Sequence, residues 1–403
     1  MRILFIAPIP FFYERGACIR SRNMITAAGK LGHEVDIVTY PVGENLRIPN
    51  VEIIRTSSVC KPPLEARMNV CRAVTDLFLY RKSMEMVSKR EYQCIIGKTP
   101  IGRWIGRKVK DKTGIPLVID VVEPALGMVR LYAKRKLFDG FFLSKVTSLA
   151  VRNPLTVGFL KGFEEANYRS ADVILANWDL VAEEVSRQSD RECLILYDTL
   201  PEVLKHPPRG VDLRGRYGIS SEEKVLLYTG AFTPQQGIEV YLGALRHMRN
   251  KKVKLVLVGP KKDKYVKMAA DLGVGDRVIF TDRLPMKELP DYFSMADVLL
   301  TAYNSGGLNA TVKLLIYLFQ RKPVVASDVP QYRQIIDERV AFMAAPTAEA
   351  FAAKIDYVLE NPMEAEKVAE NAWRYAEEKF SEKAYQRRIK RLFDIVEDIS
   401  TRN

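Results

Sequence analysis

The sequence contains few histidines and lacks the short-spaced pairs of ligands that are typical of metal sites. It has three histidines, which lie far apart in the chain at His33, His206 and His247. No Asp-x-Asp pair and no Cys-x-x-Cys pair occurs. Because a protein metal site needs several such ligands at close spacing, we expect no bound metal ion.

Cysteine is also sparse, and long apolar runs are missing. No run reaches the length of a transmembrane helix, and the opening residues, MRILFIAPIP, form an apolar run too short for a signal peptide. The cysteines are odd in number, lie mostly inside apolar patterns and resemble the reduced core thiols of cytosolic proteins. We therefore expect a soluble, cytoplasmic protein. The five cysteines are Cys18, Cys60, Cys71, Cys94 and Cys193.

The composition is that of a globular protein with an excess of positive charge. Hydrophobic residues make up 47% of the chain and charged residues 28%, as in soluble domains. At 403 residues the chain is too long for one typical core, so we expect two domains. The net charge of +13 favours anionic partners such as nucleotides, nucleic acid or an acidic membrane surface.

Short apolar runs alternate with helical stretches, which predicts two doubly wound parallel sheets. Residues 198–223 are rich in proline, glycine and charge and indicate a linker. The predicted domains are residues 1–200 and 201–380, followed by a C-terminal helix at 381–403 that packs back on the first domain. In the first half we expect strands at residues 2–8, 35–40, 51–56, 92–97, 116–122, 172–176 and 193–197. In the second half we expect them at 224–229, 253–259, 277–281, 297–302, 323–327 and 340–344.

One segment of the first half is both basic and aromatic. Between residues 129 and 161, seven basic residues stand against the single acid Asp139, and phenylalanines and leucines interleave with them. This make-up predicts either a helix lying on anionic lipid or a pair of core helices with a solvated basic face. Nucleic acid is disfavoured, because no recognised binding motif accompanies the charge.

The most informative stretch is a Gly-rich loop at residues 304–311 that opens a helix after a buried strand. Such a loop presents backbone N–H groups at the carboxyl edge of the sheet, where open α/β sheets bind ligands. Lys313 lies in the first turn of the helix, where the helix dipole disfavours a cation unless an anion is present. The stretch predicts an anion site at Lys313, and an ordinary crossover with a solvated lysine is the alternative.

Several motifs together resemble a known family. They are GHEVDIVTY in the first half, then YTGAFTPQQGIEVYLGAL, LVLVGP and YNSGGLNATVKLLIYLFQRKPVVASD in the second. In this order they are similar to the GT-B glycosyltransferases of the large "group 1" family, which retain the anomeric configuration. The resemblance implies two Rossmann-like domains facing across a cleft, with a nucleotide sugar in the C-terminal domain and the acceptor in the N-terminal one. It also implies that cations and backbone N–H groups, without a metal, stabilise the departing diphosphate.

The resemblance also assigns candidate site residues. Lys313 and Glu123 are the candidates for catalysis, and Glu123 either orients a sugar hydroxyl or caps the following helix. Gly16 and Ala17 would lie on the acceptor side, although Gly16 alone also suits a structural turn. The donor would be bound by Gly230, Gln236, Gly237, Lys261, Arg283, Asn304, Asn309, Ala310 and Thr311.

The chain departs from the family pattern at several positions. Ala231 and Gln236 stand where the family has an arginine and a lysine that contact the diphosphate. Leu308 and Ile316 replace its paired glutamates, and the Ile316 side chain cannot accept a hydrogen bond from a ribose. Val122 stands where an N-domain histidine is expected.

These features predict a retaining glycosyltransferase that needs no metal or cofactor. It would move a sugar from a nucleoside diphosphate to a glycan or lipid-linked acceptor, on the cytoplasmic membrane face. The replaced donor-site residues leave open a catalytically impaired protein that binds a glycan or a partner protein. A sugar-nucleotide epimerase on the same fold is disfavoured, because nothing supplies its acid–base residues.

Overall fold

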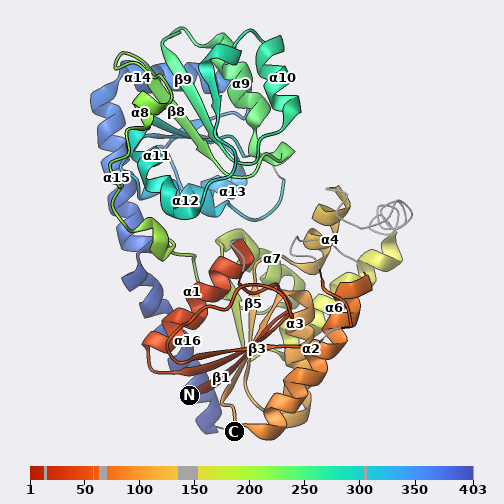
Figure 1. The fold of residues 1–403 in the computed structure, drawn as a ribbon. Coiled ribbons are helices and arrows are strands. Elements are labelled where there is room, and N and C mark those ends of the chain that lie inside the picture. The colour runs from red at the N-terminus through yellow and green to blue at the C-terminus, as the bar shows by residue number, and fades with distance from the viewer. Residues whose placement is uncertain (13–15, 58, 63–69, 135–152, 304–305, 403) are drawn as a thin grey trace. The chain divides into compact units, whose positions relative to one another are not determined.

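The structure is a computed structural model that describes residues 1–12, 16–57, 59–62, 70–134, 153–303 and 306–402. The chain divides into two units, of which unit 1 comprises Met1–Asp198 and Tyr385–Asn403, and unit 2 comprises Thr199–Ala384. Each unit is built on one parallel sheet with helices packed against it (Figure 1). This architecture confirms the expected fold class of two Rossmann-like, doubly wound domains.

Unit 1 contains a seven-stranded sheet with the order β3-β2-β1-β4-β5-β6-β7. β1 pairs with both β2 and β4, so that Ile3 lies opposite Val35 on one side and Cys94 on the other. Every residue of β4 and β5 is buried, as expected for parallel strands covered on both faces. The strands are β1 (Arg2–Ala7), β2 (Glu34–Thr39), β3 (Val51–Arg55), β4 (Cys94–Lys98), β5 (Leu117–Val121), β6 (Val173–Ala176) and β7 (Leu194–Ile195).

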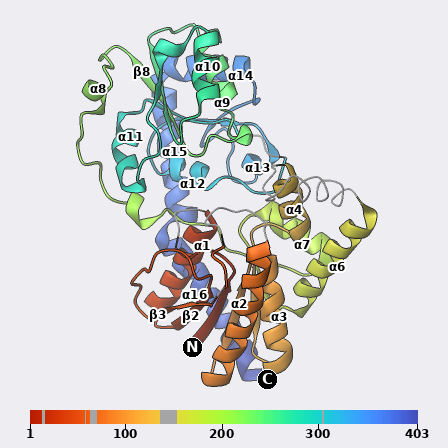
Figure 2. The same cartoon turned by 45° about the vertical axis from the view of Figure 1, so that its right-hand side comes forward.

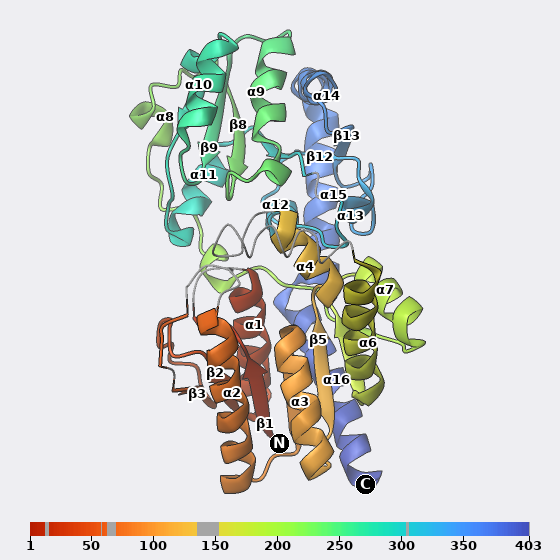
Figure 3. The same ribbon diagram turned by 90° about the vertical axis from the view of Figure 1, so that its right-hand side faces the viewer.

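Helices cover both faces of the unit 1 sheet. α1 (Gly16–Lys30) and the C-terminal α16 (Glu382–Arg402) cover one face. The other face carries α2 (Val70–Lys89), α3 (Thr99–Thr113) and α6 (Pro154–Ser170), which lie side by side (Figures 2 and 3). The remaining helices are α4 (Ala125–Lys134) and α7 (Asp179–Ser189).

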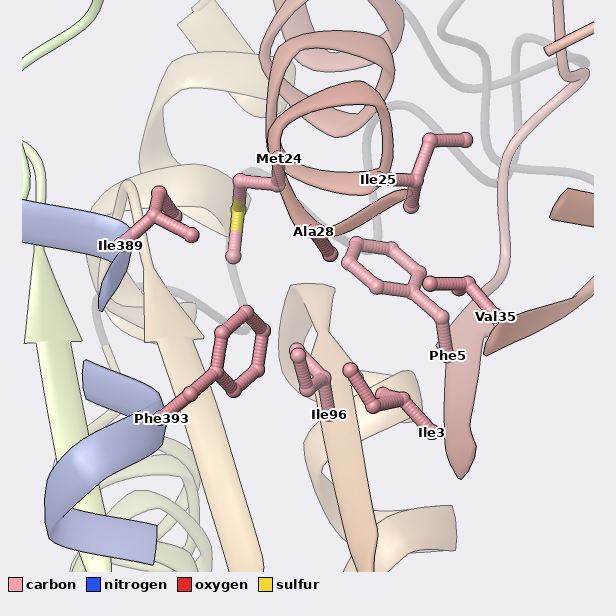
Figure 4. Close-up of a pocket in the computed structure, with 9 residues that line it drawn as sticks. All are labelled: Ile3, Phe5, Met24, Ile25, Ala28, Val35, Ile96, Ile389 and Phe393. Atoms are coloured by element: carbon pink, nitrogen blue, oxygen red, sulfur yellow. The ribbon is translucent and has the colours of Figure 1, made fainter. Parts of the chain in front are cut away.

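The end of the chain completes the core of unit 1. Ile389 and Phe393 of α16 meet Met24 of α1 and the apolar side chains of β1 and β4 (Figure 4). The space among the nine side chains drawn there is too small for a water molecule. Packing of this kind ties α16 to unit 1 through dispersion contacts and apolar burial.

Unit 2 contains a six-stranded sheet with the order β10-β9-β8-β11-β12-β13. One face carries α9 (Ile238–His247), α10 (Asp263–Asp271) and α14 (Ala348–Glu360), and the other carries α11 (Leu289–Met295), α12 (Val312–Leu318) and α15 (Pro362–Phe380). Two short helices are α8 (Leu213–Arg216) and α13 (Pro330–Arg333). The strands are β8 (Lys224–Thr229), β9 (Val253–Val258), β10 (Val278–Phe280), β11 (Val298–Thr301), β12 (Val324–Ser327) and β13 (Phe342–Ala344).

The structure corrects one expectation about the cysteines. Cys60 and Cys71 are joined in a disulfide, with their Cα atoms 5.9 Å apart. The prediction of five reduced thiols is therefore wrong for this pair. Cys18 and Cys94 are free and buried, and Cys193 is free and half-buried.

Two further findings concern membranes and metals. Within the described ranges, no helix combines the length and the apolar character needed to cross a membrane. In the same part of the chain, no group of three or more metal-ligating side chains comes together. Of the basic segment at 129–161, residues 135–152 lie outside the described residues.

Candidate functional site

Lys313, Gln236 and Tyr228 form a cluster at the carboxyl edge of the unit 2 sheet. Tyr228 is the penultimate residue of β8, Gln236 ends the short 3-10 helix η2 (Pro234–Gln236), and Lys313 lies in the first turn of α12. The Lys313 Nζ donates to Gln236 Oε1 at 2.6 Å and lies 3.8 Å from the centre of the Tyr228 ring. The structure thus brings together two predicted site residues that are far apart in the sequence.

Lys313 is a half-buried cation whose described partners are all neutral. Its contacts are an amide oxygen and an aromatic face, and none of the ion pairs among the described residues includes it. Burial lowers the pKa of Lys313 well below its ordinary value, because an ammonium loses hydration there without gaining an opposite charge. This placement favours an anion site over a solvated helix lysine, because an anion entering this site would supply the missing charge.

Two glycines make room for this cluster. Gly230 has a φ of 141°, and a Cβ there would lie 3.1 Å from Lys313 Cε and 3.3 Å from its Nζ. Gly237 has a φ of 67°, and a Cβ there would lie 2.2 Å from the Ala302 carbonyl oxygen. Both positions therefore require glycine, the first so that the lysine head can approach the backbone and the second so that α9 can begin beside the end of β11.

The loop before α12 supplies the other side of the site. Thr311 is the N-cap residue of α12, and its Oγ1 shares a hydrogen bond of 2.9 Å with the Tyr332 hydroxyl. Ala310 is buried and Asn309 is half-buried. Asn304, also predicted to bind the donor, lies outside the described residues. The described part of the predicted loop is thus held close to the start of α12, next to Lys313.

The remaining predicted residues have other surroundings. Lys261 and Arg283 are exposed, and their backbone N–H groups both donate to Asp282 Oδ1, at 3.4 and 2.8 Å. In unit 1, Gly16 and Ala17 are exposed at the start of α1.

Glu123 precedes α4 in unit 1, and its side chain folds over the first turn of that helix. A Cβ at Gly127 would come within 2.2 Å of Glu123 Oε1. This placement favours the helix-capping interpretation of Glu123 over a role in orienting a sugar, because a carboxylate over a first turn faces the unpaired N–H groups there.

Sequence reasoning missed the tyrosine hydroxyls that hold the strand ends of unit 2. Tyr317 accepts the Thr229 N–H at 2.8 Å at the end of β8, and Tyr241 accepts the Ala302 N–H at 2.6 Å just beyond β11. Burial raises the pKa of both phenols, so they stay neutral. Nothing in the sequence separates these tyrosines from ordinary core aromatics, because their role depends on which backbone groups they meet.

Unit 1 has a buried ionic network at the carboxyl ends of β4 and β5, which sequence reasoning also missed. Asp120 of β5 binds Arg20 of α1 at 2.7 Å and Lys98 of β4 at 2.9 Å. Arg20 also binds Asp198 at 2.8 Å and donates to the Leu196 carbonyl at 2.7 Å. Against the opposing effect of burial, the two cations hold the pKa of Asp120 below its usual range. These charges satisfy one another, unlike Lys313.

The comparison with known families decides what the unit 2 site belongs to. Residues 212–375 match the family model described as "Glycosyl transferases group 1". They form a group 1 glycosyl transferase domain. This domain lies within unit 2 and carries Tyr228, Gln236 and Lys313.

Two individual relatives also match, one of them over most of the chain. The chain is 31% identical over 134 residues to the GDP-mannose-dependent alpha-(1-6)-phosphatidylinositol monomannoside mannosyltransferase of Mycolicibacterium smegmatis, covering 28% of this chain and only 35% of that protein. It is 23% identical over 355 residues to the alpha-monoglucosyldiacylglycerol synthase of Streptococcus pneumoniae, covering 84% of this chain and 74% of that protein.

A solved structure shows the same fold over the whole chain. The sucrose-phosphate synthase of Thermosynechococcus elongatus superposes with a TM-score of 0.78 at 19% identity, over 98% of both chains. The two-domain architecture described above is therefore the GT-B fold.

Proposed function

We propose that this protein is a retaining glycosyltransferase that uses a nucleoside-diphosphate sugar and a glycan or lipid-linked acceptor. The observation that carries this proposal is Lys313, a half-buried amine held over Gly230 with no carboxylate partner among the described residues. A diphosphate would supply the negative charge that this amine lacks, through charge-assisted hydrogen bonds. The names of two relatives, which specify GDP-mannose and a glucosylated diacylglycerol, support this choice of donor and acceptor class.

In the reaction we propose, Lys313 stabilises the leaving group. The bond between the sugar carbon and the diphosphate oxygen breaks, and the diphosphate leaves with the electron pair. The acceptor hydroxyl oxygen bonds to the same carbon and passes its proton to the departing diphosphate oxygen. Negative charge grows on the diphosphate during this step, so a preorganised ammonium beside it lowers the barrier without a metal ion or cofactor. Gly230 leaves space for the phosphates to approach the lysine.

Calorimetric titration of the full chain with a panel of nucleotide sugars tests the proposal. We expect the wild type to bind one of them and the Lys313→Ala variant to bind it about 10- to 150-fold more weakly, because a charge-assisted hydrogen bond contributes about 1.5–3 kcal/mol. Lys252→Ala is the matched control, since Lys252 is exposed and paired with Glu222 in the same unit. A wild-type protein that binds none of the nucleotide sugars contradicts the proposal.

A second candidate is a binding protein without transferase activity. Ala231, Leu308 and Ile316 favour it, because none of these side chains can contact a phosphate or a ribose through a charge or a hydrogen bond. Turnover measured with the nucleotide sugar that binds separates the two candidates. Binding without release of free nucleotide, in the presence of acceptor lipids and glycans, identifies the non-catalytic protein.

We also propose that the protein associates peripherally with an anionic membrane surface. Leu155 and Phe159 lie one turn apart on α6 and are 84% and 71% exposed, and Lys161 of the same helix is exposed as well. A helix that carries both exposed apolar and basic side chains has the composition of one that lies on anionic lipid. Wild-type protein should sediment with anionic vesicles at low salt and less so at high salt. The Leu155→Ser/Phe159→Ser variant should sediment less, whereas Met363→Ser, at an 86% exposed apolar position in unit 2, should not.

A further inference from the structure

We propose that three side chains at and after α13, Gln331, Tyr332 and Gln334, are positioning residues that hold the loop segment 307–311 in the shape that receives the diphosphate. α12 and α13 lie at the same edge of unit 2 (Figure 1). This inference rests on the proposed function, since it concerns the same site. It assigns a task to residues that neither bind the donor themselves nor lie in the predicted loop.

The contacts hold the segment at three points, Gly307, Leu308 and Thr311. The Gln331 amide Nε2 donates to the Gly307 carbonyl, and the Gln334 Nε2 donates to the Leu308 carbonyl at 3.0 Å. The Tyr332 hydroxyl shares hydrogen bonds with Thr311 Oγ1 at 2.9 Å and with Thr301 Oγ1 at 2.5 Å. One short helix and the residue after it thus hold two loop carbonyls and the N-cap residue of α12.

Holding the carbonyls also sets the direction of the peptide N–H groups. In a planar trans peptide the C=O and the following N–H point in opposite directions. When Gln331 and Gln334 hold the carbonyls of Gly307 and Leu308, the N–H groups of Leu308 and Asn309 are turned away from α13. Backbone N–H groups presented in this way at a loop are the usual ligands of a phosphate.

Tyr332 also fixes the start of α12, and with it the position of Lys313. Its side chain is fully buried, and its ring stacks on Tyr303 with the centroids 5.7 Å apart. Its hydroxyl links Thr301, the last residue of β11, to Thr311, two residues before Lys313. The spacing between the end of the strand and the first turn of α12, and with it the position of the Lys313 head, therefore depends on this hydroxyl.

The chemistry of the two glutamines suits this task. An amide donates to a carbonyl without bringing a negative charge close to the bound phosphates. A glutamate at the same position would lose the N–H donor and add a carboxylate. Gln334→Glu is therefore the most disruptive small change for anion binding, although it preserves the size of the side chain.

The test is calorimetric titration of the full chain with the nucleotide sugar that the wild type binds, for Tyr332→Phe, Gln334→Ala and Gln334→Glu. We expect the affinity to fall about tenfold in the first two variants and further in the third, because each removes at least one hydrogen bond that holds the loop segment. In turnover assays we expect the KM for the nucleotide sugar to rise more than kcat falls. Tyr292→Phe is the matched control, since it removes a hydroxyl from a buried tyrosine pair with Tyr217, away from the loop.

The outcomes separate this inference from the proposed function. If Lys313→Ala binds more weakly but the Gln334 and Tyr332 variants bind like wild type while only their unfolding midpoints fall, the three residues are merely structural and the inference is wrong. The same holds if Tyr292→Phe weakens binding as much as Tyr332→Phe does. If the wild type binds no nucleotide sugar, the proposed function fails, and this inference fails with it.

Discussion

The carboxyl edges of the two sheets use buried polar groups in opposite ways. In unit 1, Arg20 and Lys98 are both bound to Asp120, and Arg20 is also bound to Asp198, so that two cations and two acids neutralise one another. In unit 2, neutral tyrosine hydroxyls satisfy the backbone at the strand ends, and Lys313 is left with a glutamine and an aromatic ring. The same edge of the same kind of sheet thus carries a closed network in one unit and an unbalanced charge in the other.

This difference shows what distinguishes a structural network from a binding site. A buried ion pair is destabilising to break, because its remaining member keeps a charge without hydration or a partner. An unbalanced cation is already in that condition, and a ligand with the opposite charge relieves it. We therefore expect stability to depend on the carboxyl edge of unit 1, and affinity for the proposed anionic ligand to depend on that of unit 2.

The largest effect should come from breaking the unit 1 network. Asp120→Asn leaves Arg20 and Lys98 without their shared carboxylate, and we expect the free energy of unfolding to fall by about 3–5 kcal/mol. Chemical denaturation followed by circular dichroism measures it. Lys390→Ala, which removes the exposed pair with Asp394 in the same unit, should cost less than about 0.5 kcal/mol. Equal effects of the two substitutions would remove the distinction between the network and a surface pair.

The second prediction concerns the pH dependence of anion binding at Lys313. Without ligand the pKa of Lys313 is lowered by burial, and a bound diphosphate must raise it again, because an opposite charge favours the ammonium. The complex then holds more protons than the free protein, so binding takes up a proton. Affinity should fall by up to about tenfold per pH unit as the pH rises between the two pKa values.

Calorimetry in buffers of different ionisation enthalpy measures this proton uptake directly. The Lys313→Met variant is the control, because it has no group at this position that can titrate. It should bind more weakly and show a flatter pH profile. A wild-type affinity that does not change with pH over the same interval would show that Lys313 stays protonated in the free protein or does not contact the ligand.

The smallest effect is expected for the stability of a variant that lacks the Lys313 amine. Lys313→Met should change the free energy of unfolding of the free protein by less than about 1 kcal/mol, because the lost hydrogen bond and cation–π contact are offset by the recovered cost of burying the amine. Thermal and urea unfolding without ligand measure this change. A loss as large as that of Asp120→Asn would mean that Lys313 belongs to a structural network after all.

Most of the fold could be predicted from the sequence. The strand expected at 253–259 is β9 (Val253–Val258), and that expected at 323–327 is β12 (Val324–Ser327). Strands buried on both faces appear as continuous apolar runs, which need no tertiary information to detect. The helix beginning at Val312 and the glycines at 230 and 237 could be found for the same reason, since each follows from local backbone preferences.

Contacts between distant segments could not be predicted in this way. Arg20 and Asp198 are 178 positions apart, and only the strand order brings α1 beside the segment that follows β7. The Cys60–Cys71 disulfide was missed because a spacing of 11 residues does not show whether the chain turns back between them. In each case the residue types were visible, but their distances were not.

Lys313 shows both what the sequence determines and what only the tertiary structure decides. The sequence by itself determined that a lysine stands in the first turn of a helix after a Gly-rich loop, because loop composition and helix start are local properties. Only the tertiary structure decided that this lysine is half-buried against Tyr228 and Gln236 without an acid beside it. The physical reason is that the hydration and charge balance of a side chain depend on every segment packed around it. Those segments come from β8, η2 and α12, which only the folded sheet brings together.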